Sequence, residues 1–120
     1  MRAWLIDPLS RPIVRAVSFS DDVKAQAGEL LHQLQNYDEP KIVRRLFNGD
    51  VLLVSEETWK ATGWFFRFKE EEFFGRGIIC GPPADPANPV FTSARSTTLI
   101  QLLDAAGRIS WGKRRPRADA

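Results

Sequence analysis

The stretch that decides the fold is KIVRRLFNGDVLLVS, residues 41–55. Two largely apolar segments flank Asn48-Gly49, the strongest short-range signal for a β-hairpin, because both central positions of a type I′ turn need a positive φ. We therefore predict a strand over residues 41–47 and a returning strand over residues 50–55. Such a tight turn favours a sheet built from local antiparallel pairs.

A second hairpin precedes this one. Residues 2–6, which are apolar after Arg2, predict a buried strand, and residues 13–19 alternate with the period of a second strand. Pro8 and Pro12 lie between these segments, where a turn is expected, because proline cannot donate to the ladder of a central strand. Toward the C-terminus, the patterns predict strands over residues 63–69, 76–80 and 109–111, and a polar link over residues 70–75.

Two segments have the period of a helix. After Ser20, which can cap a helix, apolar residues recur at helical spacing and predict a helix over residues 20–35. A second helix is predicted over residues 96–106, with Gly107 at the position that follows a helix end. The apolar residues on which these two predictions rest are Val23, Ala27, Leu30, Leu31, Leu34, Leu99, Leu102, Leu103 and Ala106.

The order of these elements predicts one α+β domain over residues 1–111, with a mostly antiparallel sheet of about five to six strands. Both helices are expected on one face of that sheet. A disordered basic tail is predicted over residues 112–120. The side chains expected in the core are Trp4, Ile6, Val17, Val23, Leu30, Leu34, Val51, Leu53, Phe66, Ile78, Leu99 and Leu103.

The composition is that of a single globular domain. The chain has 120 residues, of which 43% are hydrophobic, so it can bury about two thirds of its unfolded surface. One Cys and one His exclude a disulfide framework and a Cys/His metal cluster, and no cofactor is expected. No apolar run approaches the ~18 residues of a membrane span, and no secretory signal is visible. We expect a cytoplasmic protein without a membrane partner.

The candidates for catalysis are few. His32 flanks the apolar stripe of the first helix, and Cys80 ends a predicted strand, so we interpret both as structural residues. The segment from residue 75 to residue 81 lacks the third glycine of the dinucleotide fingerprint. Glu56 or Glu70 would be the candidate carboxylates of an enzyme, but neighbouring acidic residues on a strand point to opposite faces. We therefore predict no catalytic residues.

The segment WFFRFK, residues 64–69, carries the clearest binding signal. On a strand, Phe65, Arg67 and Lys69 share one face, while the other aromatic residues share the face expected to enter the core. Exposed aromatic and cationic side chains suit a protein partner, and they also resemble the surfaces that bind single-stranded nucleic acid. Three glutamates follow at once and would repel phosphate. Both interpretations stay open.

Basic residues are concentrated at the C-terminus. The whole chain has 17 basic and 15 acidic residues, and without residues 108–120 it has 12 basic and 14 acidic ones. A body of this charge has little general affinity for phosphate. The tail residues Lys113, Arg114, Arg115 and Arg117 are therefore the candidate nucleic-acid-binding residues.

Four segments in this order resemble a family of short uncharacterised proteins from phages and bacterial mobile elements. They are Ile6-Asp7-Pro8, the helix segment LLHQLQ at residues 30–35, the segment NGDVLLVSEE at residues 48–57, and GIICGP at residues 77–82. The resemblance implies a small α+β domain and a phage-like origin. It implies no activity and no site residues.

The leading functional hypothesis is a non-enzymatic protein-binding or accessory module that uses the aromatic segment, with a phage-derived or host-interaction role. The alternative is a small nucleic-acid-binding regulator that uses Arg67, Lys69 and the basic tail. An exposed edge strand would also allow a homodimer.

Overall fold

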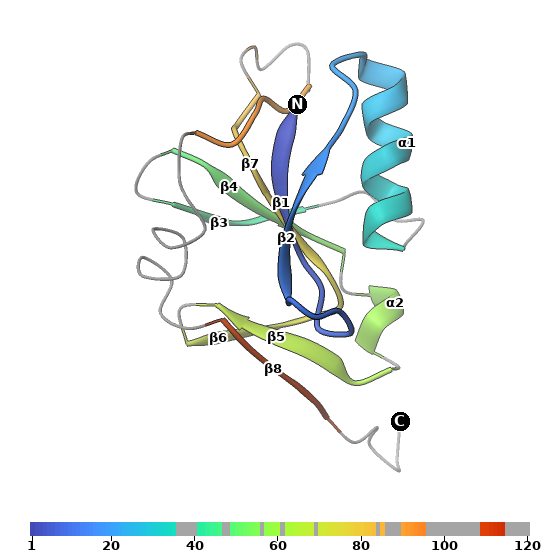
Figure 1. The fold of residues 1–120 in the computed structure, drawn as a ribbon, viewed down its shortest axis with the longest axis vertical. Helices are drawn as coiled ribbons and strands as arrows, with labels where there is room; N and C mark the ends of the chain where they lie inside the picture. The colour runs from blue at the N-terminus through green and yellow to red at the C-terminus, as the bar shows by residue number, and fades with distance from the viewer. Residues whose placement is uncertain are drawn as a thin grey trace.

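The computed structural model describes residues 1–35, 41–46, 49–55, 57–60, 62–68, 70–83, 85, 90–95 and 109–114. The described residues form eight strands in two sheets, one helix of twelve residues and one of four (Figure 1). In chain order the elements are β1 (Arg2–Ile6), β2 (Val14–Ser18), α1 (Val23–Leu34), β3 (Lys41–Arg45), β4 (Val51–Val54), α2 (Glu57–Lys60), β5 (Trp64–Phe68), β6 (Glu71–Phe74), β7 (Gly77–Cys80) and β8 (Ser110–Lys113).

The larger sheet has five strands in the order β2-β1-β7-β4-β3, and every neighbouring pair is antiparallel. The two predicted hairpins, β1–β2 and β3–β4, are confirmed. Strand β7 enters between them from later in the chain. This central position explains the uninterrupted apolar runs of β4 and β7, because both faces of these strands are covered.

Helix α1 covers one face of this sheet. Leu30 and Leu34 pack against a cluster that includes Leu5, Leu53 and Ile78. The helix begins after Asp22, whose carboxylate accepts a hydrogen bond from the Ala25 amide at 3.2 Å, so Asp22 is the N-cap in place of Ser20.

Gln26 is buried, although it falls outside the apolar stripe that the sequence predicts for this helix. Its side-chain amide donates to the Phe91 carbonyl at 2.9 Å, and its oxygen accepts from the Phe91 amide at 2.8 Å. These bonds offset the cost of burying the polar group because both of its polar atoms are satisfied. The prediction that Val23 lies in the core is wrong, since Val23 starts the helix and is 42% exposed.

The smaller sheet has the order β6-β5-β8 and covers the other face. Phe66, Phe68 and Phe73 are buried in one cluster with residues such as Ile6 and Leu52, which alternate along their strands with the residues beneath α1. The chain thus forms three layers, with α1 on one side of the five-stranded sheet and β5, β6 and β8 on the other (Figure 1).

The α+β class is confirmed, but the single sheet of five to six strands is wrong. The predicted polar link at residues 70–75 contains β6, which pairs with β5. Within the part that the structure describes, α1 is the one helix longer than four residues, and the predicted helix over residues 96–106 lies outside that part. No helix among the described residues is long and apolar enough to cross a membrane.

Of the predicted core, seven residues are confirmed as buried and two are half-buried, whereas Leu99 and Leu103 lie outside the described residues. The buried ones are Ile6, Leu30, Leu34, Val51, Leu53, Phe66 and Ile78, and the half-buried ones are Trp4 and Val17.

A polar contact joins the end of α1 to the five-stranded sheet. The Arg76 guanidinium lies 3.1 Å from the Asp7 carboxylate, and both side chains are largely buried. Arg76 also donates to the Gln33 carbonyl at 2.9 Å, and the buried Trp59 indole donates to the Leu34 carbonyl at 2.8 Å. These donors satisfy carbonyls that the last helical turn leaves without a partner in the helix.

Candidate binding surface

The outer face of the three-stranded sheet brings both predicted binding segments together. Phe65 lies opposite Gly112 of β8, and Arg67 lies opposite Glu72 of β6. Because β8 pairs with β5, the start of the predicted tail becomes part of a strand. The expected domain boundary at residue 112 falls inside that strand, which continues through Lys113.

Arg114 completes this face. Its backbone amide donates to the Gly63 carbonyl at 2.7 Å, which fixes the chain just past β8. Its guanidinium carbon lies 5.1 Å from the centre of the Phe65 ring, within the range of a cation–π contact. The same ring lies over Gly112, where a Cβ atom would be 2.7 Å from the ring Cζ. Glycine is thus needed there to let the ring lie flat on the strand.

Glu72 links the two arginines. Its carboxylate accepts a hydrogen bond from Arg67 Nη2 at 2.8 Å and another from Arg114 Nε at 3.1 Å, and Arg114 Nη2 also donates to it. The hydrogen bonds from Arg114 and then from Arg67 lower the pKa of the Glu72 carboxyl below its usual value. We call Phe65, Arg67, Glu72 and Arg114 the aromatic–basic face. It carries two cations and one anion.

A second group of rings and cations lies along the same two strands. Trp64 and Trp111 are stacked with their centroids 5.9 Å apart. The Arg11 guanidinium lies 3.7 Å from the Trp111 ring centre, and the Lys113 ammonium lies 5.6 Å from that of Trp64. Lys113 and Arg114 lie on opposite faces of the sheet, because neighbouring residues of a strand point to opposite faces.

The candidate binding residues predicted from the sequence do not all lie on one surface. Phe65, Arg67 and Arg114 meet on the aromatic–basic face, and Lys113 lies with the tryptophans. The remaining candidates, Lys69, Arg115 and Arg117, lie outside the described residues.

The sequence analysis misses Glu72, because it groups this residue with the two neighbouring glutamates that would repel phosphate. The period of a strand could have indicated its role, since residue 72 shares one face of a strand with Phe74. Its partner Arg114 is harder to predict from the sequence, because the two residues are 42 positions apart.

The structure does not bring His32 and Cys80 together as a catalytic pair. Cys80 is fully buried in the cluster beneath α1, and burial raises the pKa of its thiol to about 12. A thiol in that state is a poor nucleophile. His32 is exposed on α1. Among the described residues, no group of three His, Cys, Asp or Glu side chains could hold a metal ion.

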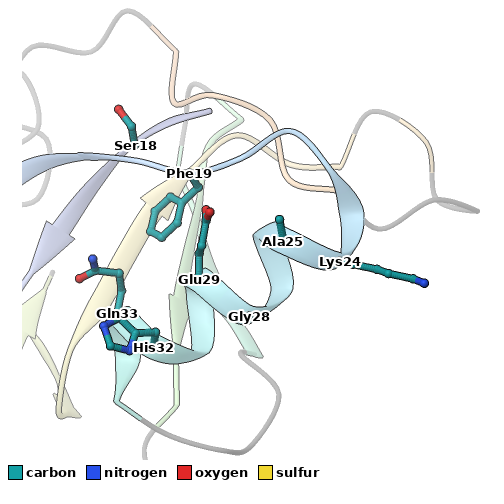
Figure 2. Close-up of a pocket in the computed structure, with 8 residues that line it drawn as sticks. All are labelled: Ser18, Phe19, Lys24, Ala25, Gly28, Glu29, His32 and Gln33. Atoms are coloured by element: carbon teal, nitrogen blue, oxygen red, sulfur yellow. The ribbon is translucent and has the colours of Figure 1, made fainter.

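His32 instead lines a shallow pocket between α1 and the end of β2. Its volume is about 410 Å³. Figure 2 shows Glu29 directed toward Phe19, with His32 and Gln33 side by side and Lys24 pointing away. The Glu29 carboxylate accepts a hydrogen bond from the Ser20 amide at 2.7 Å. Because His32 and Glu29 are both exposed to water here, the pocket does not indicate catalysis.

Comparison with known proteins gives no relative from which a role could be transferred: no family model, no curated protein and no solved structure matches the chain.

Proposed function

We propose that this chain is a non-enzymatic protein-binding module whose aromatic–basic face binds an acidic, partly apolar segment of a partner protein. One observation carries the proposal: Arg67 and Arg114 converge on the single carboxylate of Glu72, beside the ring of Phe65. The proposed place of action is the cytoplasm.

The charge of the face favours an acidic ligand. The side chains of Arg67 and Arg114 are 50% and 58% exposed, so both remain within reach of a partner. Each guanidinium has five N–H donors, and Glu72 accepts from only some of them. A carboxylate of the partner can therefore bind the arginine pair in the same way as Glu72 does.

The apolar part of the face supplies contact area next to those charges. Phe65 and Phe74 are paired across β5 and β6, and both are half-buried. A partner side chain that covers the Phe65 edge would exclude water from the arginine contacts. Aromatic and arginine residues are enriched at the energetic centres of protein interfaces for this reason.

The arrangement favours a protein over single-stranded nucleic acid. Nucleobases bind such strands by stacking on aromatic rings, but Arg114 lies over Phe65, and Arg11 lies over Trp111. A base would have to displace these cations.

The test is a selection of peptides from a random library on the full chain. We expect enrichment of peptides that combine Asp or Glu with an aromatic or branched apolar residue. The double substitution Arg67→Ala with Arg114→Ala should weaken such a peptide about tenfold, equivalent to about 1.4 kcal/mol. Arg45→Ala on β3 is the matched control, because Arg45 is also exposed and lies on the other sheet.

Glu72→Gln should change the affinity for an acidic peptide in the opposite direction. This variant removes the competing carboxylate, so an acidic peptide should bind more tightly than it does to the unchanged chain. Enrichment of peptides without acidic residues would contradict the proposal. So would a single-stranded oligonucleotide that outcompetes the selected peptide at physiological salt, which would favour the nucleic-acid alternative.

A further inference from the structure

Strand β2 forms one edge of the five-stranded sheet, on the side away from β7. The Phe19 amide and the Ile13 carbonyl both bond to the segment containing β1, at 2.8 Å each. Because the direction of backbone groups alternates along a strand, the N–H and C=O groups of Val14, Ala16 and Ser18 point outward. Within the described part of the chain, no residue bonds to them from that side.

The two edges of this sheet differ in how they are protected. On β3, the register shifts between Ile42 and Arg44, and the strand carries three exposed cations. Irregularity and charge of this kind hinder pairing with another strand. Strand β2 keeps a regular five-residue register, and its outward positions include the small, exposed residues Ala16 and Ser18.

We propose that a second copy of this chain adds to the β2 edge in antiparallel fashion, with Ala16 opposite Ala16 across a two-fold axis. In this register Val14 lies opposite Ser18, and Arg15 lies opposite Val17, so all three outward-pointing residues of each strand bond to the other copy. A register centred on Arg15 would place two like charges directly opposite each other, which is unfavourable. The result is a continuous ten-stranded sheet with an isologous interface.

Charge complementarity supports a second copy as the occupant. Arg15 pairs with Leu5, which belongs to the cluster beneath α1, so the Arg15 side chain lies on the helix side of the sheet. It is exposed, and it forms no ion pair within the described residues. On that same side, the pocket beside β2 carries the carboxylate of Glu29 (Figure 2).

In the proposed dimer, Arg15 of each copy extends along the pocket of the other copy toward Glu29. Phe19 and Ala25 line this pocket, and open space lies where a Cβ of Gly28 would be. The pocket can thus accept the aliphatic part of an arginine side chain. The interface uses β2 and α1 and leaves the aromatic–basic face uncovered. A result that contradicts the dimer would therefore leave the proposed function unaffected.

The first test is the mass in solution over a concentration series, by sedimentation equilibrium. We expect the full chain to approach twice its monomer mass of 13.6 kDa. Ala16→Pro removes only an outward N–H, which edge strands tolerate, so this variant should fold and stay monomeric. Ala16→Thr retains the N–H and should remain a dimer. An unchanged chain that is monomeric throughout, or a folded Ala16→Pro variant that is dimeric, would overturn the proposal.

The second test is a charge exchange. Arg15→Glu and Glu29→Arg should each be monomeric alone, because like charges would meet at both contacts of the homodimer. Mixed in equal amounts, they should form a heterodimer in which one contact joins the two original residues and the other joins the two substituted ones. A mixture that stays monomeric would overturn the contact between Arg15 and Glu29.

Cysteine cross-linking tests the register. In the proposed dimer, Ala16→Cys places two thiols on a directly opposed pair whose Cα atoms lie about 5.5 Å apart, which a disulfide can bridge. Ser18→Cys places them at opposite ends of the paired segment and should not cross-link. The buried Cys80 gives no competing reaction. Cross-linking of the Ser18→Cys variant, with none in the Ala16→Cys variant, would overturn the register.

Discussion

The two faces of β5 show how one strand can serve stability and binding at the same time. On its inner face, Phe66 and Phe68 are almost fully buried against the five-stranded sheet. On its outer face, Phe65 and Arg67 remain accessible and contact Arg114 and Glu72. The buried side chains of the inner face hold the strand in place. The position of the strand in turn sets where the side chains of its outer face lie. Substitutions on the inner face should therefore affect folding, and those on the outer face should affect binding.

The largest effect is expected for Phe66→Ala. Phe66 has no exposed surface, and its ring lies 5.6 Å from that of Phe73 between the two sheets. The free energy of unfolding should fall by about 3–5 kcal/mol, because a large cavity would remain. Chemical denaturation measures this change. For comparison, Phe65→Ala should cost less than about 1 kcal/mol, and an equal loss in both variants would contradict the distinction between the faces.

The buried pair beside the larger sheet should come next. Asp7→Ala leaves the Arg76 guanidinium without its carboxylate in a site where that side chain is only 14% exposed. An uncompensated buried charge typically costs about 3–5 kcal/mol, and the partial exposure here places the expected loss near about 3 kcal/mol. Thermal unfolding of this variant and of the double variant Asp7→Ala with Arg76→Met would test the cause. The double variant should recover part of the loss.

Helix α1 allows the same comparison between a buried and an exposed face. Leu30→Ala should lower the free energy of unfolding by about 2–5 kcal/mol, since Leu30 packs against the sheet. Val23→Ala should change it by less than about 0.5 kcal/mol, because Val23 is exposed at the first helical position. Similar losses in the two variants, measured by denaturation, would mean that Val23 packs in the core together with Leu30, as the sequence predicts.

A small effect on stability is expected for Glu72→Gln, and it should depend on pH. The pKa of Glu72 is lower in the folded chain than its ordinary value of 4.5, so the carboxylate stabilises the fold above pH 4.5. That contribution is lost as the pH falls through the lower, folded-state pKa. Because Glu72 is partly exposed, we expect less than about 1 kcal/mol at neutral pH.

The measurement for this variant is the difference in unfolding free energy from the unchanged chain at neutral and at acid pH. The difference should shrink in acid and in high salt. A difference that is the same under all these conditions would mean that the two arginines do not act on Glu72 through its charge.

Much of the fold follows from local patterns in the sequence. The hairpins β1–β2 and β3–β4 are predictable because their turns and apolar periods lie within the hairpins themselves. Strand β6 is not, because its glutamates are typical of a solvated link. Those carboxylates are tolerated on a strand because Arg44 pairs with Glu71, and Arg67 and Arg114 pair with Glu72. Only the three-dimensional pairing of distant segments supplies these partners.

The same limit applies to the candidate site. Phe65 and Arg67 can be assigned to one face from the period of a single strand, whereas the sequence alone places Arg114 in a separate tail. The pairing of β5 with β8 joins them, and no local pattern at residues 110–113 indicates which strand will be the neighbour. Gln26 shows a similar case in the core, since its partner Phe91 lies 65 residues away.

The central claim is that the aromatic–basic face is where an acidic partner segment binds. The most direct test is to titrate an isotope-labelled chain with an acidic, partly apolar peptide and to follow backbone amide shifts by NMR. We predict the largest shifts at Phe65, Arg67, Gly112 and Arg114, with little change along β3. Shifts concentrated on α1 or β3, with those four amides unmoved at saturation, would contradict it.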